Sequence, residues 1–336
     1  MSLGCGFRVM LLTLLLTTSV LESVAMAGHD MAFAFLQHRA RHGYDALLGI
    51  PVVASRPVVR HETQISLEHA NQFSGDRQGS ERLLLDGETS ELVIRYRRRL
   101  DSCWQLEAHL PFISHSTGLF DRAIHEWHEF FGFPDADRDM VGYEQISYSY
   151  VNGSEAAPQV SAPQSGVGDV QLAVQRSMNC LQRLASANNH SILRFGLKLP
   201  TGNAKELRGS GQTDVFADIQ SPVWRINERW SWGASIGMLV MGDSEELISQ
   251  RPVAAYSTFG LNWQFLPDLS VIAQLHLSSP FYASKLSALG GGTVSLITGG
   301  RYELSPSQSL EISISEDIKV DSAPDISARL AWVYRH

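Results

Sequence analysis

Three side chains within residues 121–139 have the types and spacing of a metal site. His125, His128 and Glu129 share one face if this stretch is helical, and imidazole and carboxylate groups are common zinc ligands. The spacing differs from the H-E-x-x-H pattern of zinc proteases. The same stretch is rich in aromatic residues such as Trp127. It therefore also fits a short amphipathic helix that packs its aromatic side and leaves the histidines in water, and both interpretations stay open.

Two other patterns are incomplete versions of known sites. The aspartates at 135, 137 and 139 could hold calcium, but their stretch lacks the glycine and the distal glutamate of an EF-hand loop. The Ser-His-Ser sequence at 114–116 places a nucleophile beside a base, without an orienting third group or a G-x-S-x-G motif. We therefore predict that the chain is not an enzyme and needs no cofactor, with a hydrolase site as the less favoured alternative.

Charged residues that alternate with apolar ones are the best candidates for acting on a solute. If their segments are strands of one closed sheet, the charged faces line a common interior. The predicted lining residues are Arg95, Arg97, Arg99, Glu107, His109, Arg194, Lys198, Asp214 and Asp218. A three-residue turn at 101–103 then predicts three cross-strand pairs, Arg95–His109, Arg97–Glu107 and Arg99–Gln105.

Such an interior has two interpretations. It can be a charged pore that selects solutes, or a lattice of ion pairs that fills the barrel and closes it. Adjacent rows carry opposite charges, which favours pairing between them. The number of strands does not decide between these interpretations, because twelve lies between the strand number of small filled barrels and that of wide channels.

Cys103 and Cys180 fall at the same end of two strands that are predicted to be neighbours. This end faces the periplasm in the predicted arrangement, and the periplasm is oxidising. We predict that the two cysteines lie close together and can form a disulfide. Two unpaired thiols are the alternative.

The elements that would position these residues are β-strands. Apolar and polar residues alternate with period two from Glu62 to the C-terminus; at 310–315, for example, leucine and isoleucine alternate with glutamate and serine. The alternating segments are about ten residues or longer, which is long for a soluble sheet and typical of tilted membrane strands. Short connections alternate with long ones, as periplasmic turns and outer loops do.

Twelve spanning strands can be placed on this pattern. They cover residues 61–73, 82–100, 103–115, 168–178, 190–200, 213–223, 230–241, 252–265, 270–280, 292–304, 308–318 and 325–335. An even number returns both ends to the periplasm. The predicted fold class is all-β, a transmembrane antiparallel up-and-down β-barrel of twelve strands (alternatively fourteen), with a short helix in the long first outer loop. Residues 143–151 also alternate, and we assign them to that loop as a strand extension above the membrane.

The N-terminal residues indicate export. Residues 1–27 combine Arg8, an apolar run and the small-x-small site Ala25-Met26-Ala27, which is typical of a signal peptide cleaved after Ala27. Residues 28–60 precede the barrel of residues 61–336 and form either a periplasmic lead or a plug in the lumen. The net charge of −8, without a lysine/arginine tract, argues against a nucleic-acid partner.

Three stretches carry a family resemblance: LLDGETSELVIRY at 84–96, LPFISHSTGLFDRAIHEWHEFFGFPDADRD at 110–139, and residues 166–211 with their GVGD and KLPTG elements. Together they resemble an uncharacterised family of bacterial outer-membrane barrels of unknown function. The last stretch is also weakly similar to outer-membrane proteins of aromatic-degradation pathways. The resemblance implies an outer-membrane barrel and brings no activity with it. One departure is the C-terminus, which ends Tyr334-Arg335-His336 rather than on an aromatic residue.

We therefore expect a protein of the bacterial outer membrane that is a channel or transporter for small solutes. The alternative is a structural or interaction barrel with a closed, charge-paired lumen. The expected partners are outer-membrane lipid, the barrel-assembly machinery during insertion, and a small-molecule solute.

Overall fold

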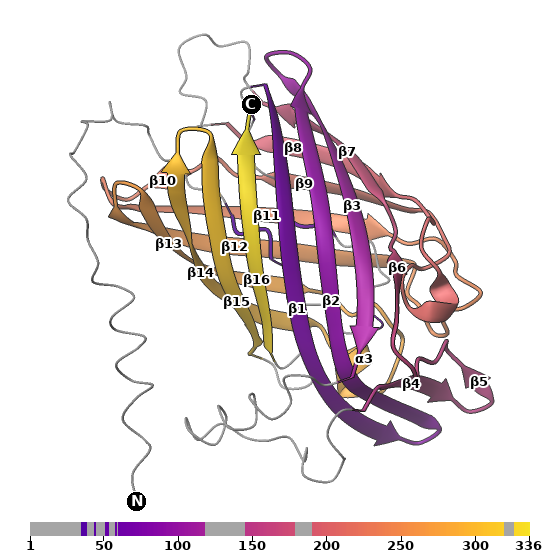
Figure 1. The fold of residues 1–336 in the computed structure, drawn as a ribbon. Helices are drawn as coiled ribbons and strands as arrows, with labels where there is room; N and C mark the ends of the chain where they lie inside the picture. Colours follow the sequence, from indigo (N-terminus) through magenta and orange to yellow (C-terminus); the bar gives the residue numbers. More distant parts are fainter. Residues whose placement is uncertain are drawn as a thin grey trace, which may run out of the picture. The chain divides into compact units, whose positions relative to one another are not determined.

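Twelve antiparallel strands close into a β-barrel in the computed structural model (Figure 1). The structure describes residues 35–38, 44, 51–53, 58, 60–117, 145–178, 190–318 and 326–336. The barrel strands are β1 (His61–Gln78), β2 (Glu81–Arg99), β3 (Trp104–Ser116), β6 (Gln164–Val167) with β7 (Gln171–Ser177), β8 (Ile192–Lys198), β9 (Asp214–Gln220), β11 (Trp230–Val240), β12 (Val253–Leu266), β13 (Leu269–Ser278), β14 (Thr293–Ser305), β15 (Gln308–Asp317) and β16 (Ile326–Arg335). Closure is made by β1 and β16, which lie side by side in Figure 1 and pair from Glu62↔Arg335 to Asn71↔Ile326.

β6 and β7 share one position in the barrel wall. β6 pairs with residues 112–115 of β3, and β7 pairs with residues 104–109 of the same strand. Residues 168–170 form a bulge between β6 and β7, where the Gly168 N–H donates to the Pro111 carbonyl. β4 (Ser147–Asn152) instead extends the sheet beyond the barrel, where it pairs with Glu81–Asp86 of β2 and with the short β5 (Glu155–Ala156). The described part of the alternating segment at 143–151 thus contributes β4 as a strand extension, and the prediction of twelve strands is confirmed.

The burial pattern of the strands is the inverse of that in a soluble protein. In β15, Ile312 is 64% exposed, whereas its neighbours Glu311 and Ser313 are each 2% exposed. The same alternation of exposed apolar and buried polar side chains runs along β3, β9, β12, β13 and β16. Because period two sends successive side chains to opposite faces, the wall is apolar outside and polar inside. This arrangement suits lipid outside the barrel and an enclosed polar interior.

The connections differ at the two ends of the barrel. At the end that holds the C-terminus, which we call the turn end, connections such as 100–103, 266–269 and 305–308 are short. At the opposite end, the loop end, most of them are long. Residues of the loops and of neighbouring strands form a buried apolar cluster that includes Tyr148, Tyr150, Tyr256 and Tyr282.

Helical structure is minor in the described ranges, which contain the four-residue α3 (Ser287–Gly290) and the 3-10 turn η3 (Ala204–Glu206). None of their helices has the length and hydropathy needed to cross a membrane. The helix expected in the first outer loop lies outside the described residues.

Candidate functional site

Eight of the nine predicted lining residues are buried inside the barrel. These are Arg95, Arg97, Glu107, His109, Arg194, Lys198, Asp214 and Asp218. The predicted register of β2 and β3 is also observed, with Arg95 opposite His109 and Arg97 opposite Glu107. Arg99 is the exception. It lies opposite Gln105 as predicted, but it is exposed and donates to the carbonyls of Asp101 and Ser102 in the turn, so it does not line the interior.

The middle of the interior is occupied by a cluster of four charges from four strands. Arg194 of β8 donates through Nε and Nη2 to Asp218 Oδ2 of β9, at 2.9 and 2.6 Å. Arg95 of β2 donates to Glu107 of β3 at 2.7 Å, and Arg194 lies 3.5 Å from the other oxygen of that carboxylate. Tyr256 also donates to Asp218. Each buried charge thus has an opposite charge within contact distance, the condition under which burial of ions is tolerated.

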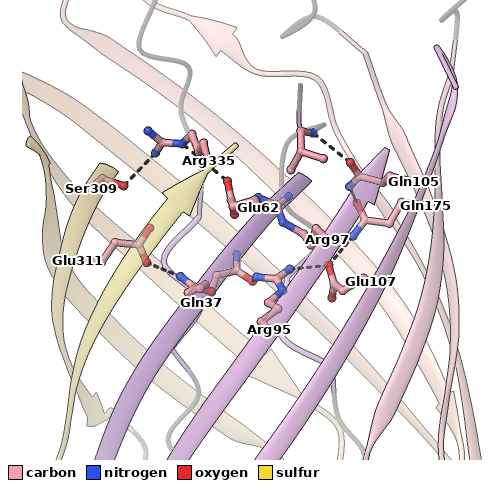
Figure 2. A network of polar contacts seen from close by, with 12 residues as sticks. Gln37, Glu62, Arg95, Arg97, Gln105, Glu107, Gln175, Ser309, Glu311 and Arg335 are labelled. Atoms are coloured by element: carbon pink, nitrogen blue, oxygen red, sulfur yellow. Dashed lines mark hydrogen bonds and ion pairs between the residues drawn. The ribbon is translucent and has the colours of Figure 1, made fainter. Parts of the chain in front are cut away.

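A second cluster lies toward the turn end (Figure 2). Glu311 accepts from Arg301 at 2.8 Å, from Arg329 at 3.2 Å and from Gln64 at 3.2 Å. Arg97 is paired with Glu62, and Glu62 also lies 3.7 Å from Arg335. The labelled side chains in Figure 2 come from neighbouring strands of the wall and, for Gln37, from the N-terminal segment, and they form one connected network. Apart from Arg97, the sequence interpretation missed the residues of this cluster, although each falls on the polar side of an alternating segment.

The third cluster surrounds Lys198 toward the loop end. Its ammonium group lies 2.5 Å from Asp169 Oδ2 and 3.2 Å from Asp214 Oδ2. Asp169 also accepts the backbone N–H groups of Gly202 and Ser210. Asp169 was not predicted, because it follows β6 in the bulge, where the strand alternation is interrupted. Asp169 belongs to the GVGD element and Lys198 to KLPTG, so this ion pair joins the two elements in the structure.

The described residues of the segment 28–60 contact the interior face of the barrel at all levels. Toward the loop end, Tyr44 donates to the Pro158 carbonyl and its own carbonyl accepts from Tyr282. In the middle, the backbone of Leu36 makes two hydrogen bonds of 3.0 Å with the Gln274 side chain. Toward the turn end, the Val58 N–H donates to Gln105.

The charged lattice takes part in the same contacts. Arg95 donates to the Gln37 side chain at 2.6 Å, and Arg194 donates to the Val52 carbonyl. Phe35, Leu36 and Val53 pack on Ile272 and Ile297, two apolar residues that point inward. The segment therefore shares hydrogen-bond partners with the lattice and covers the apolar part of the wall.

His38 is a titratable residue of this segment whose ring contacts the wall on both sides. Its two ring nitrogens lie 2.9 Å from Ser313 Oγ and 2.7 Å from Ser327 Oγ. Burial and, to a lesser degree, the charge of Arg329 lower the pKa of His38 from 6.5 to about 3. The carboxylate of Glu68 on β1 lies 4.0 Å from His38 Nε2, but its charge does not offset the lowering of the His38 pKa by burial. The imidazole is therefore neutral at neutral pH and bridges two strands of the wall.

We predict that acid releases this segment from the wall. Above pH 6.5 the imidazole is neutral whether docked or released, whereas between pH 6.5 and 3 only the released state takes up a proton. Docking should therefore weaken by about tenfold for each unit of pH below 6.5. Protease cleavage within residues 28–60, normalised to cleavage of the denatured chain at the same pH, measures the release. His38→Gln, which stays neutral, should remove the pH dependence; an unchanged pH profile in this variant would show that His38 is not the group responsible.

The other candidate sites are the metal, calcium and hydrolase patterns of the sequence. His125, His128 and Glu129 and the aspartates at 135, 137 and 139 lie outside the described residues. Within the ranges that are described, no cluster of three or more His, Cys, Asp or Glu side chains could hold a metal ion. His115 is fully buried, with Thr89 Oγ1 3.0 Å from Nδ1 and the Leu207 carbonyl 3.0 Å from Nε2. Both ring nitrogens thus have partners other than Ser114 or Ser116.

Cys103 lies at the start of β3 and is disulfide-bonded. Cys180, its predicted partner, lies outside the described residues. The Cys103–Cys180 pairing therefore stays a prediction.

Comparison with known proteins agrees with the fold. A family model described as "Protein of unknown function (DUF3187)" matches residues 12–336. No curated protein matches the sequence. Among solved structures, the COG4313 outer membrane channel from Pseudomonas putida F1 is similar over 83% of this chain and 96% of its own, with 16% identity and a TM-score of 0.55.

Two toluene transporters are less similar. TodX of P. putida has 10% identity and a TM-score of 0.41 over 83% of this chain and 91% of its own. TbuX of Ralstonia pickettii has 10% identity and a TM-score of 0.40 over 83% and 90%. Similarity at this level supports no inference about solutes.

Proposed function

The chain belongs to the DUF3187 family, and from this premise we propose that it is a channel for small solutes in the bacterial outer membrane, closed at rest by its N-terminal segment. The observation that carries the proposal is the inverted burial of the strands, apolar outside and polar inside. A lipid-facing wall around a polar interior is the arrangement of outer-membrane channels. The turn end then faces the periplasm, and the loop end faces the outside.

The N-terminal segment supports a gated rather than a permanently filled barrel. Its contacts with the wall include polar side chains such as Gln274, Ser313 and Ser327. These are neutral hydrogen bonds, which individually contribute only about 0.5–1.5 kcal/mol. Movement of the segment would expose polar groups that water can satisfy, so opening does not require that the barrel itself unfold.

A structural barrel is the second candidate, and the ion-pair lattice favours it. Arg194 and Lys198 each contact two carboxylates, and Glu311 contacts two guanidinium groups. If these pairs hold the lumen closed after the N-terminal segment has moved, the barrel conducts nothing. Its role would then be to bind a partner through its outer loops.

Planar-bilayer recording of the full chain distinguishes the two functions. The channel predicts discrete conductance steps that are rare at pH 7 and frequent at pH 4.5, where His38 of the released segment is protonated. Folded barrel that stays silent at both pH values would contradict the channel and favour the structural role. Insertion is checked in the same sample by the heat-dependent gel mobility of folded barrel.

Aromatic solutes are not part of the proposal, because the resemblance of the GVGD and KLPTG stretch to proteins of aromatic-degradation pathways is weak and the ion pair between Asp169 and Lys198 identifies no solute.

A further inference from the structure

We propose that Ser90, His69 and Glu88 form a serine-hydrolase site on the outer face of the barrel, the side of the wall away from the charged interior. The site lies toward the loop ends of β1 and β2, and it acts on acyl esters of membrane lipids. Because it is on the other face of the wall, the proposal does not depend on whether the barrel conducts.

The three side chains have the connectivity of a catalytic triad. His69 of β1 lies directly opposite Ser90 of β2, and its Nδ1 is 2.9 Å from Ser90 Oγ. Its Nε2 is 3.5 Å from Glu88 Oε2, and catalytic hydrogen bonds are often long before substrate binds. A serine nucleophile needs a base within hydrogen-bond reach and a third group that orients the base. This arrangement supplies both.

Glu88 is held in place, as a residue that orients a base must be. Its side chain is fully buried, and its other oxygen, Oε1, accepts from Asn71 Nδ2 at 3.2 Å. A carboxylate on the Nε2 side favours the tautomer in which Nε2 carries the proton and Nδ1 accepts one from Ser90. His69 itself is 26% exposed, and Ser90 is also partly exposed, so base and nucleophile are accessible from outside the barrel.

A donor for the oxyanion is placed on the other side of the nucleophile. Ser114 of β3 lies directly opposite Ser90, where opposed Cβ atoms are about 4.5–5.5 Å apart. Side-chain hydroxyl groups can donate to the oxyanion of an acyl-transfer reaction. Base, nucleophile and donor thus follow one another along β1, β2 and β3, which run side by side in Figure 1. The Ser-His-Ser pattern at 114–116 therefore supplies the donor, while its own histidine is buried on the other face.

The surroundings of the site indicate the class of substrate. The next row of the same outer face, toward the turn end, consists of Leu67, Leu92 and Phe112. These side chains are 51%, 43% and 45% exposed, and in an outer-membrane wall they face lipid tails. An acyl chain that lies along this row brings its ester group to the height of Ser90, at the edge of the apolar band. The site therefore favours a long-chain ester over a water-soluble one.

Hydrolysis proceeds in two steps, with water as the co-reactant. In the first, Ser90 Oγ bonds to the ester carbonyl carbon and its proton passes to His69. The bond to the leaving alcohol then breaks, and the alcohol takes that proton. In the second, water attacks the acyl-serine and gives a proton to His69, the bond to Ser90 breaks, and the proton returns to Oγ. The products are a fatty acid and an alcohol.

A long-chain alkyl fluorophosphonate, which reacts with activated serine nucleophiles, tests the site in the intact protein in detergent. We expect a single adduct, located on Ser90 by peptide mass spectrometry and lost in Ser90→Ala. His69→Gln should slow labelling by about 100-fold or more, the usual contribution of a general base. Thr63→Ala is the matched control, because it removes a hydroxyl from the outer face of β1 away from the site; it should label at the rate of the parent protein.

Heat-dependent gel mobility shows in each case that the variant is folded. A folded parent protein that forms no adduct would overturn the proposal. An adduct on another residue, or one that persists in Ser90→Ala, would do the same.

Release of fatty acid from lipids tests the substrate and its source. The parent protein is incubated with phosphatidylethanolamine vesicles in one arm and with lipopolysaccharide in the other, and the arm that releases fatty acid identifies the lipid. Ser90→Ala should release none in either arm. No release by the parent protein from both lipids, or equal release by Ser90→Ala, would overturn the assignment. Ser90→Ala should leave any conductance unchanged, so failure of this proposal and failure of the channel are distinguishable.

Discussion

Arg194→Met is expected to lower the free energy of unfolding of the barrel by about 3–5 kcal/mol, the usual cost of removing one partner of a buried ion pair. Arg194 is 1% exposed and contacts both Asp218 and Glu107, so its removal leaves two carboxylates inside the barrel with fewer donors. Methionine fills a similar volume without a charge. The loss therefore reports on electrostatics rather than on a cavity.

Urea-induced unfolding in detergent, followed by tryptophan fluorescence, measures this change. Arg176→Met is the matched control, because Arg176 is on the adjacent strand β7, exposed, and 5.4 Å from the ring of Trp104; it should lose about 1 kcal/mol or less. The double variant Arg194→Met/Asp218→Asn should recover part of the lost stability, since it removes one of the two carboxylate charges that Arg194 contacts. A loss for Arg194→Met as small as that of the control would show that the lattice does not stabilise the barrel.

Deletion of residues 28–60 from the mature chain is expected to change the barrel from a closed state to one with discrete conductance steps at pH 7. The described residues of this segment bond to Gln274, Arg95, Arg194 and Gln105 on the interior wall. Without the segment these groups are free to bind water. The deletion should also lower stability, by about 0.5–1.5 kcal/mol for each hydrogen bond lost.

Single-channel recording compares the deletion with Tyr44→Phe, which keeps the segment and removes one hydroxyl that donates to Pro158. The Tyr44→Phe variant should stay closed at pH 7. If the deleted chain folds, as judged by heat-dependent gel mobility, and remains silent, the ion-pair lattice closes the lumen by itself and the gate is not the N-terminal segment.

The strands and their inward residues were predictable because a single physical rule governs them. Side chains alternate with period two, so a polar residue between exposed leucines or isoleucines must point inward, as Glu311 and Ser313 do. The register of β2 and β3 was predictable as well, because a three-residue turn at 101–103 leaves one way to align Arg97 with Glu107. Both predictions use only local geometry.

Register alone accounts for only part of the ionic lattice. Arg97 lies opposite both Glu107 on β3 and Glu62 on β1 and pairs with Glu62. Glu107 instead accepts from Arg95 and Arg194, neither of which lies opposite it. Long side chains in a closed interior reach diagonally and across the lumen, so partner choice depends on the whole cross-section. Arg99 deviates for a related reason, since at the strand end the turn carbonyls of Asp101 and Ser102 compete for its guanidinium group.

The position of the N-terminal segment was beyond sequence reasoning for another reason. Its described residues make no strand pairing, and they contact the wall through residues more than 200 positions away, such as Gln274 and Ser313. Such contacts leave no periodic pattern in the sequence. The sequence therefore leaves a periplasmic lead and a lumen plug as alternatives, without the contacts of Leu36, His38 and Tyr44 that bear on the choice.

The most direct test of the account is to attach the N-terminal segment to the wall and then release it. Ring nitrogen Nδ1 of His38 lies 2.9 Å from Ser313 Oγ, so His38→Cys/Ser313→Cys places two thiols at a point of contact, and His38→Cys alone controls for the effect of reductant on the Cys103 disulfide. Conductance is recorded in one bilayer before and after reduction. The account predicts a silent barrel while the new disulfide is intact and conductance steps once it is reduced, because the reduced variant also lacks the two hydrogen bonds through which His38 holds the segment on the wall. Equal conductance in the two states would contradict it, as would silence in both.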